Sequence, residues 1–287
     1  MKNLALVAAS LLLVSASASA DRLYLAGDAL AYGWSLDDAQ ALLSAPDNSN
    51  LFSGTIYLKG GQDFKLLTTT DFGNLEYGSA EDSENGKYTL AAGTNDEGYG
   101  KLRVAADGNY LITVELDAMS ATVELSAYQE TPVQYSSLFM VGSATNGGWS
   151  VDEGTPMYQN PETPVEFSAK GDLLEGTFKI TTAIKGGGTW NGKYWFFRNA
   201  DNEALMTLDQ EGDLQWNISE AGSYIVTGNV ATGAISIKSN TDTSVADMAA
   251  DLSEAVYYTI DGIKAENPAH GLYIRVQGGK ASKVLLR

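Results

Sequence analysis

The sequence predicts an all-β protein with two tandem immunoglobulin-like β-sandwich domains, followed by a small C-terminal β-segment. Three observations predict this fold class: an internal duplication, an apolar pattern of period two within each copy, and a last stretch with a different charge balance. Hydrophobic residues make up 44% of the 287 residues and aromatic residues 10%, which is a composition typical of packed domains.

The duplication is visible when the sequence is aligned with itself. The segment Leu23–Ser35 recurs as Leu138–Ser150, and both segments end in Gly-Trp-Ser. Further along, Phe64-Lys65 returns as Phe178-Lys179 at nearly the same offset. Two copies of this length suit the usual domain size. We therefore predict a first sandwich repeat at 21–127, a linker at 128–136 and a second repeat at 137–239.

Short runs of β-branched and aromatic residues within each copy predict the strands. They alternate apolar and polar positions and lie between clusters of Gly, Asp and Asn, as in antiparallel sandwiches. One stretch, Leu36–Leu43, favours a helical turn instead. In the first copy the expected strands are 23–26, 53–58, 63–68, 110–116 and 121–125.

The first twenty residues, 1–20, have the pattern of a secretory signal peptide. Lys2 precedes an apolar run from Leu4 to Val14, and the small residues Ala18-Ser19-Ala20 form an A-x-A cleavage site. The apolar run is too short to span a bilayer, so we expect no transmembrane segment. These features predict an exported protein that is cleaved after Ala20.

The C-terminal segment 240–287 differs from the repeats because its acids and bases balance from Ser244 onward, with five of each. Strands separated by Gly turns are expected at 256–262, 271–276 and 282–286. A segment of this size is short for an independent core, so it either docks on a neighbour or serves as a sorting signal.

The charge and the cysteine count exclude several functions. There are 36 acidic against 18 basic residues, which gives a net charge of −18 and disfavours nucleic acid and anionic lipid as partners. The chain has no Cys, which excludes thiol nucleophiles, thiolate zinc sites and disulfides. A hydrolase triad would need the lone His270 of the tail, and no motif singles out a pair of glycosidase carboxylates. We therefore expect neither an enzyme nor a cofactor, and oxygen-rich runs such as Asp47–Asn50 lack EF-hand spacing and are expected to be turns rather than metal sites.

The tryptophans point to a binding function. Trp34 and Trp149 follow glycines in polar loops, where a large ring is unexpected. Each ring either forms a ligand platform or plugs the end of its sandwich, and the sequence leaves both interpretations open. The polar, Gly-rich surroundings of Trp190 favour a ligand contact, whereas Trp195 and Trp216 alternate like core residues of strands.

An exposed indole offers a flat apolar face that matches the C–H face of a pyranose ring. The hydroxyl groups at the rim of the sugar then need hydrogen-bond donors and acceptors. We therefore predict a neutral polysaccharide or oligosaccharide as the ligand. The candidate polar contacts in the second copy are Lys179, Lys185, Lys193, Arg198 and Asn191.

The recurring elements resemble the tandem domains of the SusE/SusF family of outer-membrane starch-binding proteins. These elements are the opening that ends in Gly-Trp-Ser, the Phe-Lys strand and the closing Gly-x-Tyr motif, and together they cover 21–239. The resemblance implies non-catalytic binding of α-glucans at the cell surface through two aromatic platforms, with other outer-membrane glycan-uptake proteins as partners. By this resemblance the platform residues are Trp149 and Trp190 in copy two, and Trp34 and Phe72 in copy one, with Tyr77 as a further candidate.

Two features depart from that family. Its members are lipoproteins, and this chain has no Cys to acylate. The tail instead resembles the C-terminal sorting segments of proteins exported by type IX secretion. We expect a protein at the cell surface, associated with the outer membrane or extracellular, without a Cys-linked lipid. The rival hypothesis is a surface structural or adhesin subunit, in which the sandwiches act as spacers and the loops contact protein.

Overall fold

The computed structural model describes residues 21–81, 86–182, 190 and 192–240, together with 256–259, 264–265, 271–277 and 280–286 of the tail. The chain divides into two compact units, Met1–Asn240 and Thr241–Arg287. The all-β prediction is confirmed, because the described residues form strands and loops with one short 3₁₀ turn. The expected signal peptide and His270 lie outside the described residues.

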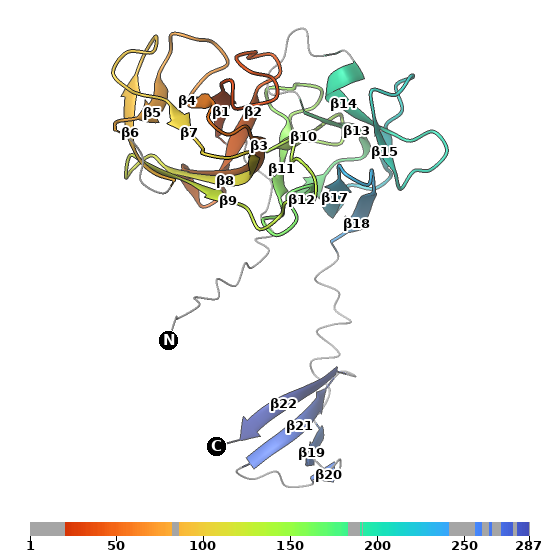
Figure 1. Ribbon diagram of the computed structural model, residues 1–287. Coiled ribbons are helices and arrows are strands. Elements are labelled where there is room, and N and C mark those ends of the chain that lie inside the picture. The colour runs from red at the N-terminus through yellow and green to blue at the C-terminus, as the bar shows by residue number, and fades with distance from the viewer. Residues whose placement is uncertain are drawn as a thin grey trace. The chain divides into compact units, whose positions relative to one another are not determined.

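The strands of repeat 1 follow one another around a nearly closed sheet (Figure 1). The order is β1-β2-β3-β8-β9-β6-β5-β4, and β4 also pairs with β1, which closes the ring, while β7 lies on the other side of β4. The bounds are β1 Arg22–Ala26, β2 Gln40–Ala45, β3 Asn48–Leu58, β4 Asp63–Leu67, β5 Glu76–Ser79, β6 Lys87–Gly93, β7 Leu102–Arg103, β8 Gly108–Glu115 and β9 Ser120–Leu125.

Alternation along these strands produces the core of repeat 1. On β8, Tyr110, Ile112 and Val114 point inward, and on β4, Phe64 and Leu66 do so. Successive side chains of a strand point to opposite faces, so the residues between them lie on the outer face of the sheet. Every strand expected in the first copy is present. The ends differ from the expected ends by no more than two residues, except that β3 begins five residues earlier than expected.

Repeat 2 has a similar path with an open strand order, β15-β14-β13-β10-β11-β12-β17-β18, and β16 pairs with β13. The two ends approach each other, because Met206 N donates to Gly233 O at 2.7 Å and Ile235 N donates to Ala204 O at 2.9 Å. The bounds are β10 Leu138–Val141, β11 Thr155–Gln159, β12 Glu166–Leu173, β13 Gly176–Thr181, β14 Trp195–Arg198, β15 Met206–Leu208, β16 Trp216–Ile218, β17 Gly222–Asn229 and β18 Ile235–Ser239.

The helical turn predicted for Leu36–Leu43 is wrong. Residues 40–45 form strand β2, which pairs with β1 on one side and with β3 on the other. The backbone bonds and the burial that these two neighbours supply outweigh a weak local helical preference.

The two repeats pack against each other within the first unit. Phe139, on the outer face of β10, is fully buried against Ala39, Ala41 and Leu43 of repeat 1. Gln159 of repeat 2 adds a pair of hydrogen bonds, because its amide oxygen accepts from Thr55 N at 2.6 Å and its amide nitrogen donates to Thr55 O at 2.9 Å. The contact therefore has both an apolar centre and a polar edge.

The segment predicted as a linker, 128–136, is held by side chains of repeat 1. The buried amide of Asn109 donates to the carbonyls of Tyr128 and Thr131 and accepts from Val133 N at 2.8 Å. At the other end, Ser136 Oγ donates to Ala41 O at 2.8 Å. These contacts fix the entry into repeat 2, while the predicted domain boundaries stay predictions.

The tail unit contains a four-stranded antiparallel sheet in the order β20-β19-β21-β22, with bounds β19 Val256–Thr259, β20 Lys264–Ala265, β21 Gly271–Gln277 and β22 Lys280–Leu286. Strands occur in all three expected places, and the two-residue β20 was not expected. Within the described part of the chain, no helix has the length and apolar character needed to cross a membrane.

The contact between the repeats leads to a stability prediction. Phe139→Ala removes a fully buried ring, and large-to-small changes of this kind cost about 3–5 kcal/mol of unfolding free energy. Urea denaturation measures the loss. Leu125→Ala, at a side chain that is 62% exposed, is the control and should change the unfolding free energy by less than about 1 kcal/mol. Equal stability of Phe139→Ala and wild type would contradict the packing described above.

Candidate functional site

A buried lysine lies at the centre of the candidate site in repeat 2. On β13, Phe178 and Ile180 point into the core, so Lys179 between them must lie on the outer face. That face is covered, and Lys179 is only 6% exposed. A charged ammonium in such a place requires partners that replace water.

Aromatic rings supply part of that environment. The ammonium nitrogen of Lys179 lies 4.6 Å from the ring centroid of Trp195, 5.0 Å from Phe197, 5.5 Å from Trp149 and 5.8 Å from Trp190. Trp195 and Phe197 are two apart on β14, so both face outward beside Lys179. Cation–π contacts of desolvated ammonium groups contribute about 2 kcal/mol.

An ion pair completes the surroundings of Lys179. Its ammonium donates to Asp213 Oδ1 at 2.7 Å, and Gln215 Nε2 donates to Asp213 Oδ2 at 2.7 Å. The hydrogen bond from Lys179 holds the pKa of Asp213 below its ordinary value, although burial opposes ionisation. The carboxylate is therefore ionised at neutral pH and neutralises the lysine beneath the rings.

The loop after β10 presents Trp149. Gly142 N donates to Gly148 O at 2.8 Å, and Gly148 N donates to Thr145 O at 3.1 Å, which closes the loop just before the tryptophan. Gly148 has a φ of +57°, a conformation that L side chains rarely adopt. Glycine at this position therefore lets the chain turn so that the ring of Trp149 projects over Lys179.

Trp149 and Trp190 lie together at the surface. Their ring centroids are 6.4 Å apart with an interplanar angle of 51°, and the side chains are 38% and 52% exposed. Trp190 also stacks on the buried Trp195, with centroids 4.8 Å apart and an angle of 17°. Trp149 and Trp190 border an open cleft of about 760 Å³, which is also lined by Lys179, Gly192, Phe197, Gln210, Gly212, Asp213 and Gln215.

The strand register identifies the equivalent positions in repeat 1. Leu66 pairs with Tyr77 and Leu67 with Glu76, as Ile180 pairs with Phe196 and Thr181 with Trp195. Glu76 of repeat 1 therefore occupies the place of Trp195, and Tyr77 the place of the core residue Phe196. Likewise the pairs Phe64–Leu102 and Phe178–Trp216 align Tyr99 with Asp213 and Lys101 with Gln215.

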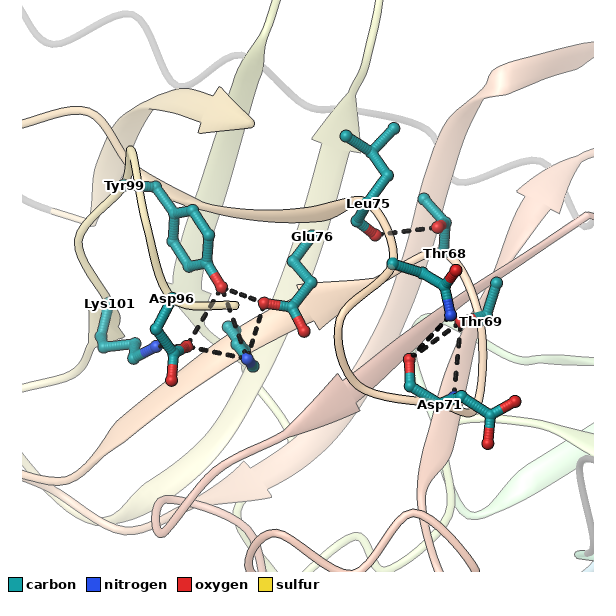
Figure 2. A network of polar contacts seen from close by, with 10 residues as sticks. Thr68, Thr69, Asp71, Leu75, Glu76, Asp96, Tyr99 and Lys101 are labelled. Carbon is teal, nitrogen blue, oxygen red and sulfur yellow. Dashed lines mark hydrogen bonds and ion pairs between the residues drawn. The ribbon is translucent and has the colours of Figure 1, made fainter. Parts of the chain in front are cut away.

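Lys65 of repeat 1 is held by acids, and Figure 2 labels the two carboxylates, Glu76 and Asp96. Its ammonium donates to Glu76 Oε2 at 2.8 Å and to Asp96 Oδ1 at 2.8 Å. The hydroxyl of Tyr99 donates to both carboxylates, and Lys101 pairs with Asp96. In repeat 1 this network takes the place that Trp195 has in repeat 2. Charged groups therefore form the base of the repeat 1 site, where repeat 2 has an indole.

The pKa values in this network follow from its contacts. Burial opposes ionisation of Glu76, but hydrogen bonds from Lys65 and Tyr99 outweigh it and hold its pKa below the ordinary value. Hydrogen bonds from Lys101 and Lys65 hold the pKa of Asp96 well below its ordinary value. Both carboxylates are therefore ionised at neutral pH and balance the two lysines.

Two rings stand over Lys65 as in repeat 2. Its ammonium lies 5.0 Å from the ring centroid of Phe72 and 5.7 Å from that of Trp34. The loop that carries Phe72 is closed by Thr68, whose hydroxyl donates to Leu75 O at 2.8 Å (Figure 2). Phe72 is 50% exposed, so this ring also faces solvent.

The structure brings some of the predicted site residues together and separates others. Trp149, Trp190 and Lys179 share one cleft. Lys193 instead pairs with Asp38 of repeat 1 at 2.9 Å. Arg198 supports the site indirectly, because its Nε donates to Gln215 O at 3.0 Å. Two further candidates, Lys185 and Asn191, lie outside the described residues.

Tyr77 does not contribute a platform. It is 9% exposed and belongs to the core of repeat 1, as its strand register requires. Trp195 and Trp216 are 1% and 2% exposed, which confirms that both are buried. Trp216 belongs to the main core of repeat 2, whereas Trp195 packs in a smaller cluster with Val141 and Phe197 on the outer face of the sheet. In the described residues no group of three or more His, Cys, Asp or Glu side chains could hold a metal ion.

Several residues of the site were not predicted. The recurrence of Phe-Lys was a usable signal for Lys65, since its counterpart Lys179 was a candidate. The alternation of Trp195 and Phe197 on one strand was a second signal. Asp213, Gln215 and Gln210 come from a separate loop, and nothing in their local sequence distinguishes them from surface residues.

No protein-family model matches the sequence, and no curated protein matches it. Among solved structures, SusF from Bacteroides thetaiotaomicron is similar at 18% sequence identity and a TM-score of 0.31. The alignment covers 78% of this chain and 48% of that one, so this chain spans about half the length of SusF.

The network in repeat 1 leads to a pH prediction. Glu76→Gln removes one of the two carboxylates that pair with Lys65, while Asp96 remains. The loss of a hydrogen bond between charged groups should lower the unfolding free energy at neutral pH by about 1.5–3 kcal/mol. The folded-state pKa of Glu76 is lowered; its stabilising effect is therefore present above the unfolded pKa of about 4.3 and is lost as the pH falls through the folded pKa. The difference between the two proteins should accordingly shrink below about pH 4.

Urea denaturation between pH 3 and pH 7 measures this difference. Glu124→Gln, at an exposed side chain of the same repeat, removes the same charge and should follow wild type at every pH. A constant difference between Glu76→Gln and wild type across this range would show that the ion pair does not stabilise the fold.

Proposed function

We propose that the protein binds neutral polysaccharide, with α-glucan favoured, at a non-catalytic site in repeat 2. Trp149 and Trp190 are the stacking platforms, and the groups around Asp213 supply hydrogen bonds to sugar hydroxyls. The protein acts after export, at the cell surface or in the surrounding medium, alongside other proteins of glycan uptake. No side chain is assigned a catalytic role.

The observation that carries this proposal is the exposure of two adjacent tryptophans over one cleft. Trp149 and Trp190 are 38% and 52% exposed, and both border the same open space. Exposed indoles cost solvation free energy unless a ligand covers them. Because Trp190 already stacks on Trp195, its orientation is fixed before a ligand arrives, which lowers the entropic cost of binding.

The angle between the rings supports a curved chain as the ligand. Two platforms in one plane would match a flat glycan ribbon, in which successive sugar faces are nearly coplanar. The rings of Trp149 and Trp190 are tilted by 51°. Successive faces of an α-glucan turn along its helical path, so consecutive glucose units can meet the two rings in succession.

The charges of the site favour an uncharged ligand. The ammonium of Lys179 is paired with Asp213, so the cleft offers no free cation from that lysine. The net charge of −18 disfavours polyanionic glycans. Two stacking contacts and a few hydrogen bonds, less the cost of association, predict a dissociation constant between about 10 μM and 1 mM.

Repeat 2 is proposed as the main site because repeat 1 lacks part of the aromatic base. Glu76 takes the place of Trp195, so Phe72 has no equivalent of the indole on which Trp190 stacks. Trp34 and Phe72 still offer two ring faces over Lys65. Repeat 1 is therefore expected to bind glucan more weakly than repeat 2.

Substitution of the platforms tests the proposed function. Each ring contributes about 0.5–1.5 kcal/mol beyond burial, by analogy with aromatic pairs. Trp149→Ala and Trp190→Ala should therefore each weaken binding about 2- to 12-fold. Retardation of the full chain in amylopectin gels measures the dissociation constants. Leu174→Ala, at a side chain that is 48% exposed in the same repeat, should bind as wild type.

Other matrices complete the experiment. We expect retardation on amylopectin and pullulan to exceed that on xylan and mannan. Unchanged retardation of either tryptophan variant, or no retardation of wild type on any glycan, would refute the proposed function. Saturable binding to a protein surface without any glycan effect would instead support an adhesin.

A further inference from the structure

A carboxylate of repeat 1 contacts the segment of repeat 2 that carries Trp190. Asp38 lies in the loop between β1 and β2. Its Oδ1 accepts hydrogen bonds from Lys193 Nζ at 2.9 Å and from the hydroxyl of Tyr194 at 2.9 Å. Its Oδ2 accepts a hydrogen bond from Ser35 at 2.9 Å, which orients the carboxylate within its own loop.

The residues that Asp38 contacts form the 3₁₀ turn η1, Gly192–Tyr194. This turn begins two residues after Trp190 and leads directly into Trp195, against which Trp190 stacks. On its other side the turn is bonded to repeat 2 itself, because Tyr194 O accepts from Thr181 Oγ1 at 2.9 Å and from Thr182 N at 2.9 Å. The turn is thus held from both repeats.

The charges of this contact are maintained at neutral pH. Burial opposes ionisation of Asp38, but hydrogen bonds from Lys193, Ser35 and Tyr194 outweigh it and hold its pKa below the ordinary value. The side chains of Asp38 and Lys193 are 36% and 54% exposed, at the wall of an inter-repeat cleft of about 510 Å³. An ion pair that is half exposed is weakened by salt.

We infer that Asp38 is a positioning residue for the glycan platform: repeat 1 fixes the turn that holds Trp190 over the cleft of repeat 2. This inference rests on the proposed function. Asp38 is absent from the lining of the Trp149–Trp190 cleft, so it acts on the ligand only through the turn. Without the charge of Asp38, the attachment of the turn to repeat 1 is weakened while the hydrogen bonds to Thr181 and Thr182 remain, so more of the ordering of the ring must take place when the ligand binds.

Asp38 can be changed without separating the repeats. The apolar contact at Phe139 and the hydrogen bonds of Gln159 lie elsewhere in the interface and remain. Asp38→Asn keeps the size of the side chain and an acceptor oxygen while it removes the charge. The variant should therefore fold, with a melting temperature close to that of wild type.

The test uses the full chain and amylopectin gels at low salt. Asp38→Asn and Lys193→Met should each weaken binding about three- to tenfold, and the double variant should bind no more weakly than either single variant. Asp28→Asn, at an exposed carboxylate of the same repeat, changes the net charge equally and should bind as wild type. Trp190→Ala, measured in parallel, tests the platform itself.

Salt provides a readout that a merely structural role would not change. A neutral glycan contributes no salt dependence of its own, and the Lys179–Asp213 pair of the cleft is present in both proteins. Between 20 and 500 mM NaCl, wild-type affinity should therefore fall more than that of Asp38→Asn, because only wild type also has the screened Asp38–Lys193 pair. Any of three results would overturn the inference. Asp38→Asn binds as tightly as wild type, the losses in the double variant are additive, or wild type and Asp38→Asn show the same salt dependence. If Trp190→Ala binds as wild type, the proposed function fails instead.

Discussion

A lysine buried on the outer face of a β-strand is the constraint on which the site depends. Lys179 alternates with core residues on β13, so the strand requires it to face outward, yet it is only 6% exposed. Its charge can remain there only if an anion and polarisable groups replace water. Asp213 supplies the anion, and the surrounding aromatic rings supply the rest. The ammonium group attracts the faces of these rings, and two of them, Trp149 and Trp190, remain exposed to solvent.

The two repeats meet this constraint with different residues. In repeat 2 the strand beside the lysine places Trp195 next to it, so Trp190 can stack on a fixed indole. In repeat 1 the same position is Glu76, and Lys65 is neutralised by a network of carboxylates. Under the proposed function, the aromatic arrangement in repeat 2 provides the platform for a ligand, whereas the carboxylates of repeat 1 mainly stabilise the fold. By the further inference, repeat 1 has a supporting role, through the contact of Asp38 with the turn after Trp190.

Much of the fold follows from local sequence, whereas only part of the site does. Strands such as β4 and β8 are predictable because alternation with period two reflects a sheet with one face buried. Strand β2 was not predictable, because its pairing with β1 and β3 depends on distant segments. Lys179 and the two exposed tryptophans could be selected from residue type and context, but Tyr77 could not be separated from a platform without the strand register. Asp213 and Asp38 act through contacts between loops that lie far apart in the sequence, and composition carries no signal of such contacts.

The proposed function requires that Trp149 and Trp190 together form the glycan-binding surface. The most direct measurement is a titration of the full chain with maltohexaose. ¹H–¹⁵N correlation spectra recorded during the titration monitor the assigned indole N–H signals of the five tryptophans. The account predicts that the signals of Trp149 and Trp190 shift with a common dissociation constant. The signal of Trp216, whose indole N–H donates to Glu203 O at 3.0 Å in the core, should stay in place. Saturable shifts at Trp34 alone, or no shift at Trp149 and Trp190 at millimolar maltohexaose, would contradict the account.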